Sequence, residues 1–183
     1  MSRVDFGPKS MILPMPVLII GTYDENGVPN AMNAAWGMIS DFNEISISLS
    51  EHKTTENLKK TGAFTVSMAS ADYLDACDYV GIESGRKVPD KFIKAGFHAT
   101  KGTHVNAPLI DELPMALECV VKSFSDGILI GDIVNMCVDE SALTEGNIDL
   151  KKLKPVCFDP TNNTYVTMGD VVGKAFSDGN KLK

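Results

Sequence analysis

The segment Glu44–Ser50 constrains the fold most, because large apolar side chains alternate in it with small hydroxylated ones. Ile45, Ile47 and Leu49 occupy one set of alternate positions, and serines occupy the other. Successive side chains of a β-strand point to opposite faces, so this period of two predicts a strand with one apolar face. It is the clearest such segment in the chain and indicates a fold in which strands dominate.

Two hairpins are predicted from turn residues between apolar runs. Val17–Tyr23 leads into an Asn-Gly pair at Asn26, which favours the positive φ values of a tight turn, and a returning strand is expected over Pro29–Ile39. Met115–Phe124 and Ile128–Val138 flank a Ser-Asp-Gly turn in the same way. Two further strands are expected, at Ala63–Ala69 and Asn163–Met168.

Helices are expected only as short insertions between these strands. Thr54 or Thr55 is a suitable N-cap for a helix that Gly62 would end, and Asp72–Val80 and Pro89–Ala95 are two further short helices. A helical or irregular stretch is expected near residues 143–153. This order favours a mainly β fold, an antiparallel barrel with peripheral short helices in one domain spanning residues 1–183, over a doubly wound parallel sheet.

Composition excludes several classes of function. The net charge of −7 argues against nucleic-acid binding, which needs a clustered basic surface. The apolar run from Met11 to Ile20 is broken by prolines and too short to cross a bilayer, and no cleavage site follows it, so we expect no membrane partner and a cytoplasmic protein. The four cysteines form no metal-binding spacing, so we expect reduced thiols and no metal.

The segment after the period-two strand suits a phosphate group. Lys53 and the threonines that follow it stand where a helix begins, and a helix N-terminus exposes unpaired N–H groups with a partial positive charge. Lys53 adds a compact charge, and Thr54 or Thr55 adds a hydroxyl donor. The alternative is an ordinary capped helix whose lysine points into water, with a solvated His52 beside it instead of a proton donor.

Small residues over Asn30–Trp36 would let a planar ring approach a strand closely. Asn30, Asn33 and the only tryptophan, Trp36, could supply polar groups and an apolar wall to an isoalloxazine ring. Alternatively, Trp36 is a core or subunit-interface residue. The chain contains no GxGxxG, GxxxxGK[ST] or GxSxG motif, so neither a dinucleotide fold, a P-loop nor a hydrolase nucleophile is indicated.

Taken together, these segments resemble the flavin-reductase-like family with the FMN-binding split β-barrel, and the flavoredoxins within it. The resemblance runs from about residue 10 to 177 and depends on the order and spacing of several short motifs. These are Pro16-Val17, the Asn-Gly turn, Asn30 six before Trp36, Lys53-Thr54-Thr55-x-Asn57-Leu58, Ser84-Gly85, Asp90-Lys91-Phe92, Gly131-Asp132-Ile133, Tyr165-x-x-Met168-Gly169 and Gly173-Lys174-Ala175-Phe176.

The resemblance implies a set of FMN-binding residues. Lys53, Thr54 and Thr55 would hold the phosphate, and Lys91 would add positive charge near the cofactor. The residues implied to lie along the ring and ribityl chain are Asn30, Asn33, Ala34, Ala35, Trp36, Ser48, Leu49, Ser50 and Tyr165. Flavoredoxins carry a histidine at the late hairpin, where this chain has Ser125-Asp126-Gly127, which leaves the catalytic residues unassigned.

The family also implies redox chemistry, because FMN itself accepts the electrons. The protein would be an NAD(P)H-dependent flavin reductase or a flavoredoxin-like carrier reduced by a redox protein. It would also be a homodimer with FMN near the interface. Two alternatives remain open: a non-catalytic protein that binds or stores flavin, and a thiol-dependent redox enzyme that uses Cys77 or Cys157.

Overall fold

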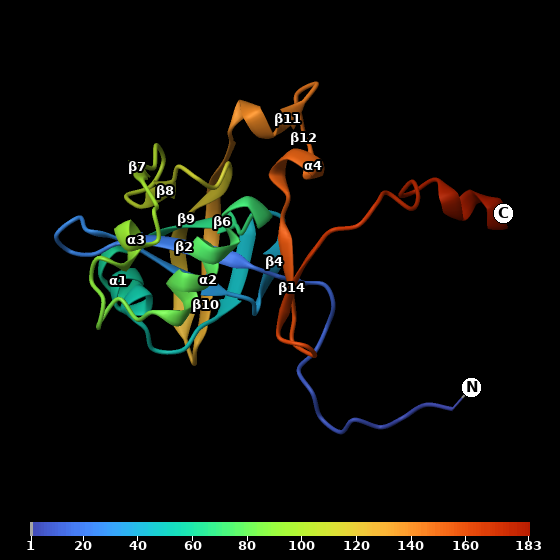
Figure 1. Ribbon diagram of the computed structural model, residues 1–183, viewed down its shortest axis with the longest axis horizontal. Helices are drawn as coiled ribbons and strands as arrows, with labels where there is room; N and C mark the ends of the chain where they lie inside the picture. The colour runs from blue at the N-terminus through green and yellow to red at the C-terminus, as the bar shows by residue number, and fades with distance from the viewer. Residues whose placement is uncertain (1) are drawn as a thin grey trace.

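The computed structural model describes residues 2–183 and is dominated by one antiparallel sheet of seven strands (Figure 1). The predicted mainly β fold is therefore confirmed. In spatial order the strands are β3 (Pro29–Ala34), β2 (Leu18–Tyr23), β6 (Ala63–Met68), β9 (Met115–Ser125), β10 (Ile128–Val138), β5 (Glu44–Ser48) and β4 (Gly37–Asp41).

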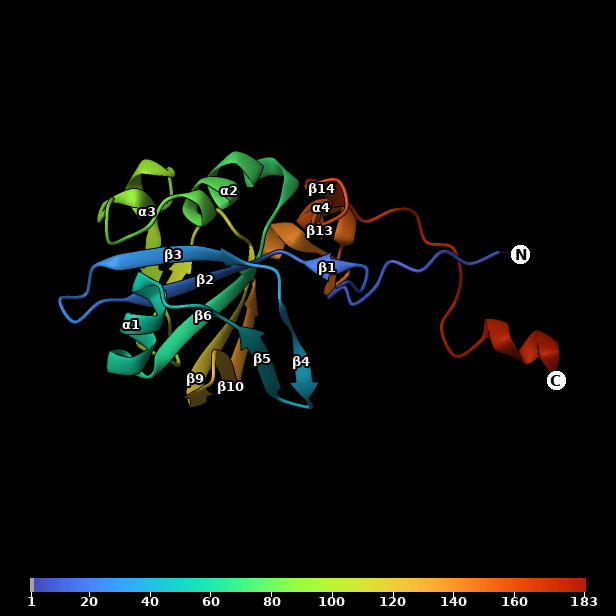
Figure 2. The same ribbon diagram turned by 90° about the horizontal axis from the view of Figure 1, so that it is seen from below.

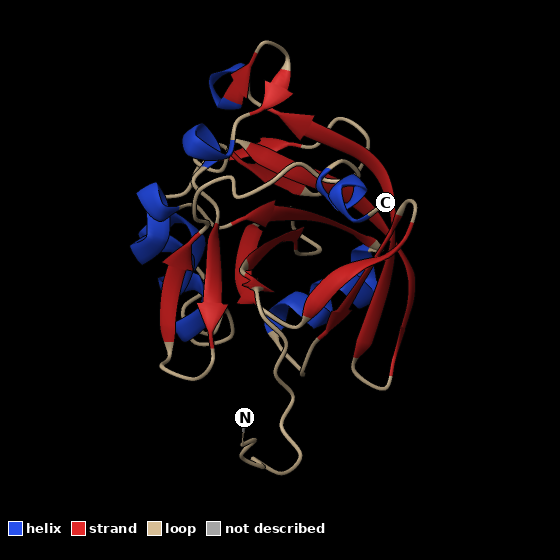
Figure 3. Cartoon of the chain, turned by 90° about the vertical axis from the view of Figure 1, so that its right-hand side faces the viewer, coloured by secondary structure: helices blue, strands red, loops and turns tan. Residues whose placement is uncertain are grey.

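The two edge strands of this sheet, β3 and β4, are neighbours in sequence and are joined only by Ala35 and Trp36. Seven strands laid flat would separate the edges by roughly 29 Å, whereas this link spans at most about 11 Å. The sheet must therefore curl until its edges approach, which gives a split barrel (Figure 3). The single returning strand predicted over Pro29–Ile39 is wrong for this reason: its first part pairs with β2 and its second part with β5.

Strand β2 is buried on both faces and separates two apolar clusters. Val17, just before it, and Ile19 face a cluster that includes Phe92 under the short helices, whereas Leu18 and Ile20 face the barrel interior. Figure 2 shows these helices packed over one side of β2 and β3. The continuous apolar run of β2 is what burial on both faces demands.

Both predicted hairpins form. The pairing of β2 with β3 follows the Asn-Gly turn, and β9 pairs with β10 around Asp126 and Gly127, which have φ values of 51° and 77°. Positive φ at both central residues matches the right-handed twist of the flanking strands. At Gly131 in β10, an added Cβ would lie 2.4 Å from the ring of Phe64, so only glycine admits this core aromatic.

The helices differ from the prediction mainly in where they begin. Helix α1 (Lys53–Thr61) has His52 as its N-cap residue, not Thr54 or Thr55, and ends as predicted at Gly62 with φ 66°. The helix expected from Asp72 is a short 3₁₀ turn followed by α2 (Leu74–Ile82), and the helix expected over residues 89–95 contracts to α3 (Lys91–Lys94). Helices α2 and α3 lie over one side of β2 and β3, whereas α1 lies on the other side, where Leu58 packs into the apolar cluster of the barrel interior (Figure 2).

Smaller elements complete the chain beside the barrel. A separate sheet consists of β1 (Met15–Pro16), β13 (Val156–Asp159) and β14 (Thr164–Thr167), the last being the strand predicted near the C-terminus. The stretch near residues 143–153 contains β11 (Leu143–Thr144), β12 (Asn147–Ile148) and α4 (Leu150–Leu153), and β7 (Ala99–Lys101) pairs with β8 (Pro108–Ile110). Both ends of the chain extend from the same side of the molecule (Figures 1 and 2), and no helix within residues 2–183 is long and apolar enough to span a membrane.

A buried carboxylate fastens the loop between β7 and β8 to the large sheet. Glu118 of β9 is only 1% exposed and accepts hydrogen bonds from the backbone N–H groups of His104 (2.8 Å) and Val105 (3.3 Å) and from Asn135 Nδ2 (2.8 Å). Burial raises the pKa of Glu118, but these hydrogen bonds outweigh it and hold the pKa below its ordinary value.

Replacing Glu118 by Gln should lower the free energy of unfolding by about 2 kcal/mol at neutral pH, because the variant loses charge-assisted hydrogen bonds. A lowered folded-state pKa stabilises the protein fully above the unfolded-state pKa, about 4.3, and this stabilisation is lost as the pH falls through the folded value. Urea denaturation should therefore show the two proteins converging below about pH 4.3. Exposed Glu140→Gln is the control, and a difference that does not depend on pH would contradict this role.

Candidate functional site

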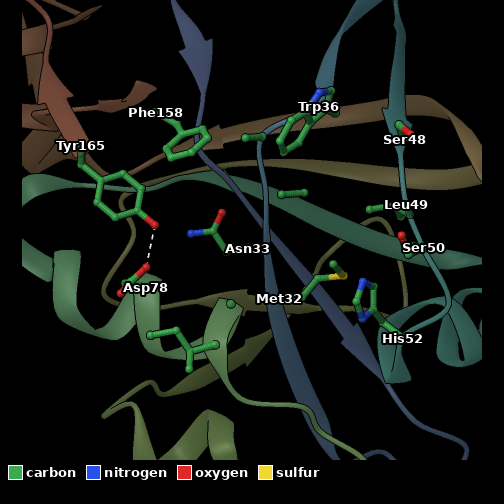
Figure 4. Close-up of a pocket in the computed structure, with 14 residues that line it drawn as sticks. Met32, Asn33, Trp36, Ser48, Leu49, Ser50, His52, Asp78, Phe158 and Tyr165 are labelled. Atoms are coloured by element: carbon green, nitrogen blue, oxygen red, sulfur yellow. Dashed lines mark hydrogen bonds between the residues drawn. The ribbon is translucent and has the colours of Figure 1, made fainter. Parts of the chain in front are cut away.

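A cavity of about 380 Å³ lies where the barrel is split, and we call it the larger cavity (Figure 4). One wall is the end of β3 with the link to β4, and a second follows the end of β5. The third is formed by α2 and the β13–β14 hairpin. The lining residues are Met32, Asn33, Ala34, Ala35, Trp36, Ser48, Leu49, Ser50, His52, Asp78, Gly81, Ile82, Phe158 and Tyr165.

A second cavity of about 200 Å³, the smaller cavity, adjoins the larger one and shares five lining residues with it. It lies between the N-terminus of α1 and the C-terminus of α2. The residues that line it are Met32, Asn33, His52, Lys53, Thr54, Val80, Gly81, Ile82, Glu83, Ser84, Gly85 and Lys91. The two cavities together form an elongated site with its lysines at one end.

The hydroxyl of Thr54 is oriented by a buried amide. Asn30 Nδ2 donates a hydrogen bond of 2.8 Å to Thr54 Oγ1, so the threonine keeps its own proton for a group in the smaller cavity. Gly85 packs against this pair: an added Cβ there would lie 2.6 Å from Asn30 Oδ1 and 3.2 Å from Lys53 Cγ. The smaller cavity therefore depends on a residue without a side chain at position 85.

Lys91 is 4% exposed and lines the smaller cavity from α3. Its ammonium donates to the carbonyl oxygens of Val80 (2.7 Å) and Glu83 (2.8 Å) at the end of α2, where carbonyls lack partners within the helix. Burial lowers the pKa of Lys91 to about 8, although the nearby Glu83 carboxylate acts in the opposite direction. At neutral pH most of the lysine is still protonated, so it adds positive charge beside Lys53.

Three aromatic rings border the larger cavity. Trp36 lies 6.4 Å from Phe158 and Phe158 lies 6.1 Å from Tyr165, measured between ring centroids. The Tyr165 hydroxyl donates a 2.6 Å hydrogen bond to Asp78 Oδ1 (Figure 4). Trp36 is 52% exposed, so the alternative of a core residue is wrong, whereas the alternative of a subunit-interface residue stays a prediction.

The structure brings most of the predicted site residues together. Those at the larger cavity are Asn33, Ala34, Ala35, Trp36, Ser48, Leu49, Ser50 and Tyr165, and those at the smaller one are Lys53, Thr54 and Lys91. Asn30 and Thr55 line neither cavity. Asn30 lies behind Thr54, and the Thr55 hydroxyl instead bonds to the backbone N and O of His52 (2.9 and 2.8 Å).

Sequence reasoning missed Asp78 and Phe158. Phe158 is the cross-strand neighbour of Tyr165, so a predicted β13–β14 hairpin would have revealed it. No comparable local signal identifies Asp78, which faces the cavity only because α2 packs beside β3.

The thiols are poorly suited to redox chemistry of their own. Burial raises the pKa of Cys77 to about 11, and it also raises the pKa of Cys157. The thiolate is the reactive form of cysteine, so neither thiol is activated. Within residues 2–183 no three His, Cys, Asp or Glu side chains cluster in a way that could hold a metal ion.

Comparison with known proteins identifies the family. The model of the flavin reductase like domain matches residues 10–159, which is most of the chain. The chain belongs to the flavin-reductase-like family. The predicted family is thereby confirmed. Membership of this family supports a flavin as the cofactor.

Solved structures of related proteins agree with this assignment. Flavoredoxin of Desulfovibrio vulgaris (Miyazaki F) is 37% identical, with a TM-score of 0.92 over 97% of this chain and 100% of that one. An FMN-binding domain of a flavin reductases-like enzyme from Shewanella baltica OS155 is 16% identical, with a TM-score of 0.78 over 87% of this chain and 88% of that one, and this likeness shows the fold alone.

A curated relative, an uncharacterized protein of Aeropyrum pernix, is 24% identical over 139 residues, or 72% of this chain. The chain spans about half the length, 53%, of that relative.

Replacing Gly85 by Ala should destabilise this flavin-reductase-like protein by about 1–3 kcal/mol, because the new methyl group would push Asn30 and Lys53 apart. Denaturant unfolding measures the effect. Gly169→Ala is the matched control, since an added Cβ there meets nothing within 4 Å and should change stability by no more than about 0.5 kcal/mol. Equal effects of the two substitutions would contradict the close packing at Gly85.

Proposed function

We propose that this protein binds one FMN non-covalently and uses it as an FMN-dependent oxidoreductase. The observation that carries the proposal is the pairing of the two cavities. One end presents lysines and a threonine hydroxyl at a helix N-terminus, and the other is lined by the alanines at the end of β3 and bordered by aromatic rings. FMN joins a phosphate to a planar ring. The lysines and the threonine hydroxyl suit the phosphate, and the cavity with the aromatic border suits the ring. The larger cavity alone falls within the size range of small-molecule sites.

Each group of residues has a distinct role in this proposal. Lys53, Thr54 and Lys91 hold the phosphate, aided by the N–H groups of the first turn of α1. The segment from Asn33 to Trp36 lies along the ring, and the small side chains of Ala34 and Ala35 admit a flat group. Bound FMN supplies a ring that accepts a hydride or electrons, and the protein supplies position, local charge and partial exclusion of water.

Replacing Lys53 by Ala should weaken FMN binding by roughly 1.5–3 kcal/mol, because a charge-assisted hydrogen bond to phosphate is lost. Fluorescence titration of the apoprotein measures this affinity. Lys60→Ala is the control, since Lys60 lies at the far end of α1 and pairs with Glu25 (2.9 Å) on the surface. Riboflavin, which lacks the phosphate, should bind the wild type much more weakly than FMN. Equal affinities for the two would contradict the phosphate site.

Two electron donors fit the proposal, NAD(P)H and a small redox protein. The ring end of the site reaches solvent at Trp36, so either a nicotinamide or a protein surface has access to it. Family membership favours neither, because one fold supports several functions.

Anaerobic mixing with NADH or NADPH should bleach the yellow flavin within seconds if the protein is a reductase. Rapid bleaching by a reduced ferredoxin-like protein, with no response to either nucleotide, would instead identify an electron carrier. FMN that stays bound and oxidised in both experiments would contradict the redox function and support a non-catalytic flavin-binding or storage protein. Stopped-flow absorbance distinguishes the three results.

We also infer that two copies associate with FMN near their interface. Strand β4 is a free edge of the large sheet, and Met38, Ile39 and Phe42 on and beside it are 68%, 55% and 99% exposed. Apolar groups on an open edge favour pairing with another chain. Because Trp36 leads directly into β4, such an interface would lie beside the larger cavity.

The four free cysteines also suit a reducing cytoplasm.

A further inference from the structure

Among the described residues that line the larger cavity, Asp78 is the only one with a carboxylate. Helix α2 places it there: the preceding residue, Cys77, is buried in the core, and Asp75, one turn earlier, is exposed and lines neither cavity. The Asp78 side chain points toward Tyr165 (Figure 4). A charged group on the wall of a cavity interacts more strongly with a bound ligand than it would in open water, because the surrounding protein screens the charge less than water does.

The phenol of Tyr165 is a hydrogen-bond donor to this carboxylate. Its O–H donates to Asp78 at 2.6 Å and is therefore not directed to a ligand. Burial and the hydrogen bond to Asp78 raise the pKa of Tyr165 to about 12, so the phenol stays protonated at neutral pH. Asn33 holds the same turn of α2 through a bond from Nδ2 to the carbonyl oxygen of Cys77 (3.2 Å).

The charges of the site are thus separated along its length. Lys53 and Lys91 lie at the smaller cavity, and neither lines the larger one. Asp78 lies at the larger cavity, where the proposed function places the ring. A ring bound there meets the Asp78 carboxylate, whereas the phosphate meets two lysines and one carboxylate, Glu83, which also lines the smaller cavity.

We propose that Asp78 sets the reduction potential of the bound flavin by opposing the negative charge that reduction adds to the ring. This inference rests on the proposed binding of FMN. Two electrons and one proton convert the neutral oxidised ring into a reduced ring with one negative charge, and a second proton would neutralise it. A carboxylate nearby disfavours the charged product and leaves the oxidised ring unaffected. In this proposal Asp78 acts on the ring only through its charge, and no bond to Asp78 forms or breaks.

The test compares potentials of the FMN-loaded wild type and Asp78→Asn in anaerobic titrations against a reference dye. The neutral amide should favour binding of reduced over oxidised FMN by about tenfold relative to the wild type. For a two-electron couple, this fold-change equals a rise of about 30 mV. Asp78→Ser, a second neutral variant, should shift the potential in the same direction and serves if the amide variant folds poorly.

Two controls separate charge from structure. Asp75→Asn removes an exposed charge from the same helix and should leave the potential unchanged. Tyr165→Phe breaks the hydrogen bond but keeps the carboxylate, so the potential should fall or stay constant. A rise in Tyr165→Phe equal to that in Asp78→Asn would overturn the proposal, because disruption of the wall would then explain both.

The outcomes also distinguish this inference from the proposed function. A wild type that takes up no FMN overturns both. A wild type that binds FMN, with unchanged potentials in both neutral variants at position 78, overturns the role of Asp78 alone.

Discussion

The short link between β3 and β4 is the constraint on which the rest of the structure depends. Because Ala35 and Trp36 alone join the two edges of a seven-stranded sheet, the sheet has to curl, and its edges part immediately beyond the link. Gly37 permits this closure: a Cβ at that position would lie 2.7 Å from Leu18 Cδ1 in the barrel interior. The split that results is where the larger cavity forms, so the closure of the fold and the position of the candidate site have one cause.

The smaller cavity depends on a different kind of fit, in which buried polar groups satisfy one another and leave selected donors free. Asn30 uses its amide on Thr54, and Lys91 uses two N–H groups on the carbonyl end of α2. Buried polar groups without partners are costly, so these bonds fix the side chains in place before any ligand binds. The third N–H of Lys91 and the proton of Thr54 would then be available to the proposed phosphate. The site is organised in advance.

What the sequence could predict was local. The strands with a period of two, the turns with glycine and the start of a helix near Lys53 all follow from neighbours along the chain. The break at Ala35–Trp36 does not, because a single glycine, Gly37, also fits a continuing strand, and the two parts of Pro29–Ile39 separate only when distant partners, β2 and β5, compete for them. The positions of Asp78 and Phe158 likewise depend on packing between elements far apart in sequence, and Asp78 reaches the cavity only through the packing of α2 on β3.

In the first turn of α1, two neighbouring threonines have different roles because their side chains point in different directions. Thr54 and Thr55 are equivalent candidates in the sequence, but successive residues of a helix are rotated by about 100°, so both hydroxyls cannot face one cavity. Thr54 faces the smaller cavity and is held by Asn30, whereas Thr55 is fully buried and bonds to His52 at the helix start. Thr55 therefore stabilises the helix whose N-terminus Thr54 and Lys53 present. Any contribution of Thr55 to the proposed binding of FMN would be indirect, through the shape of that turn.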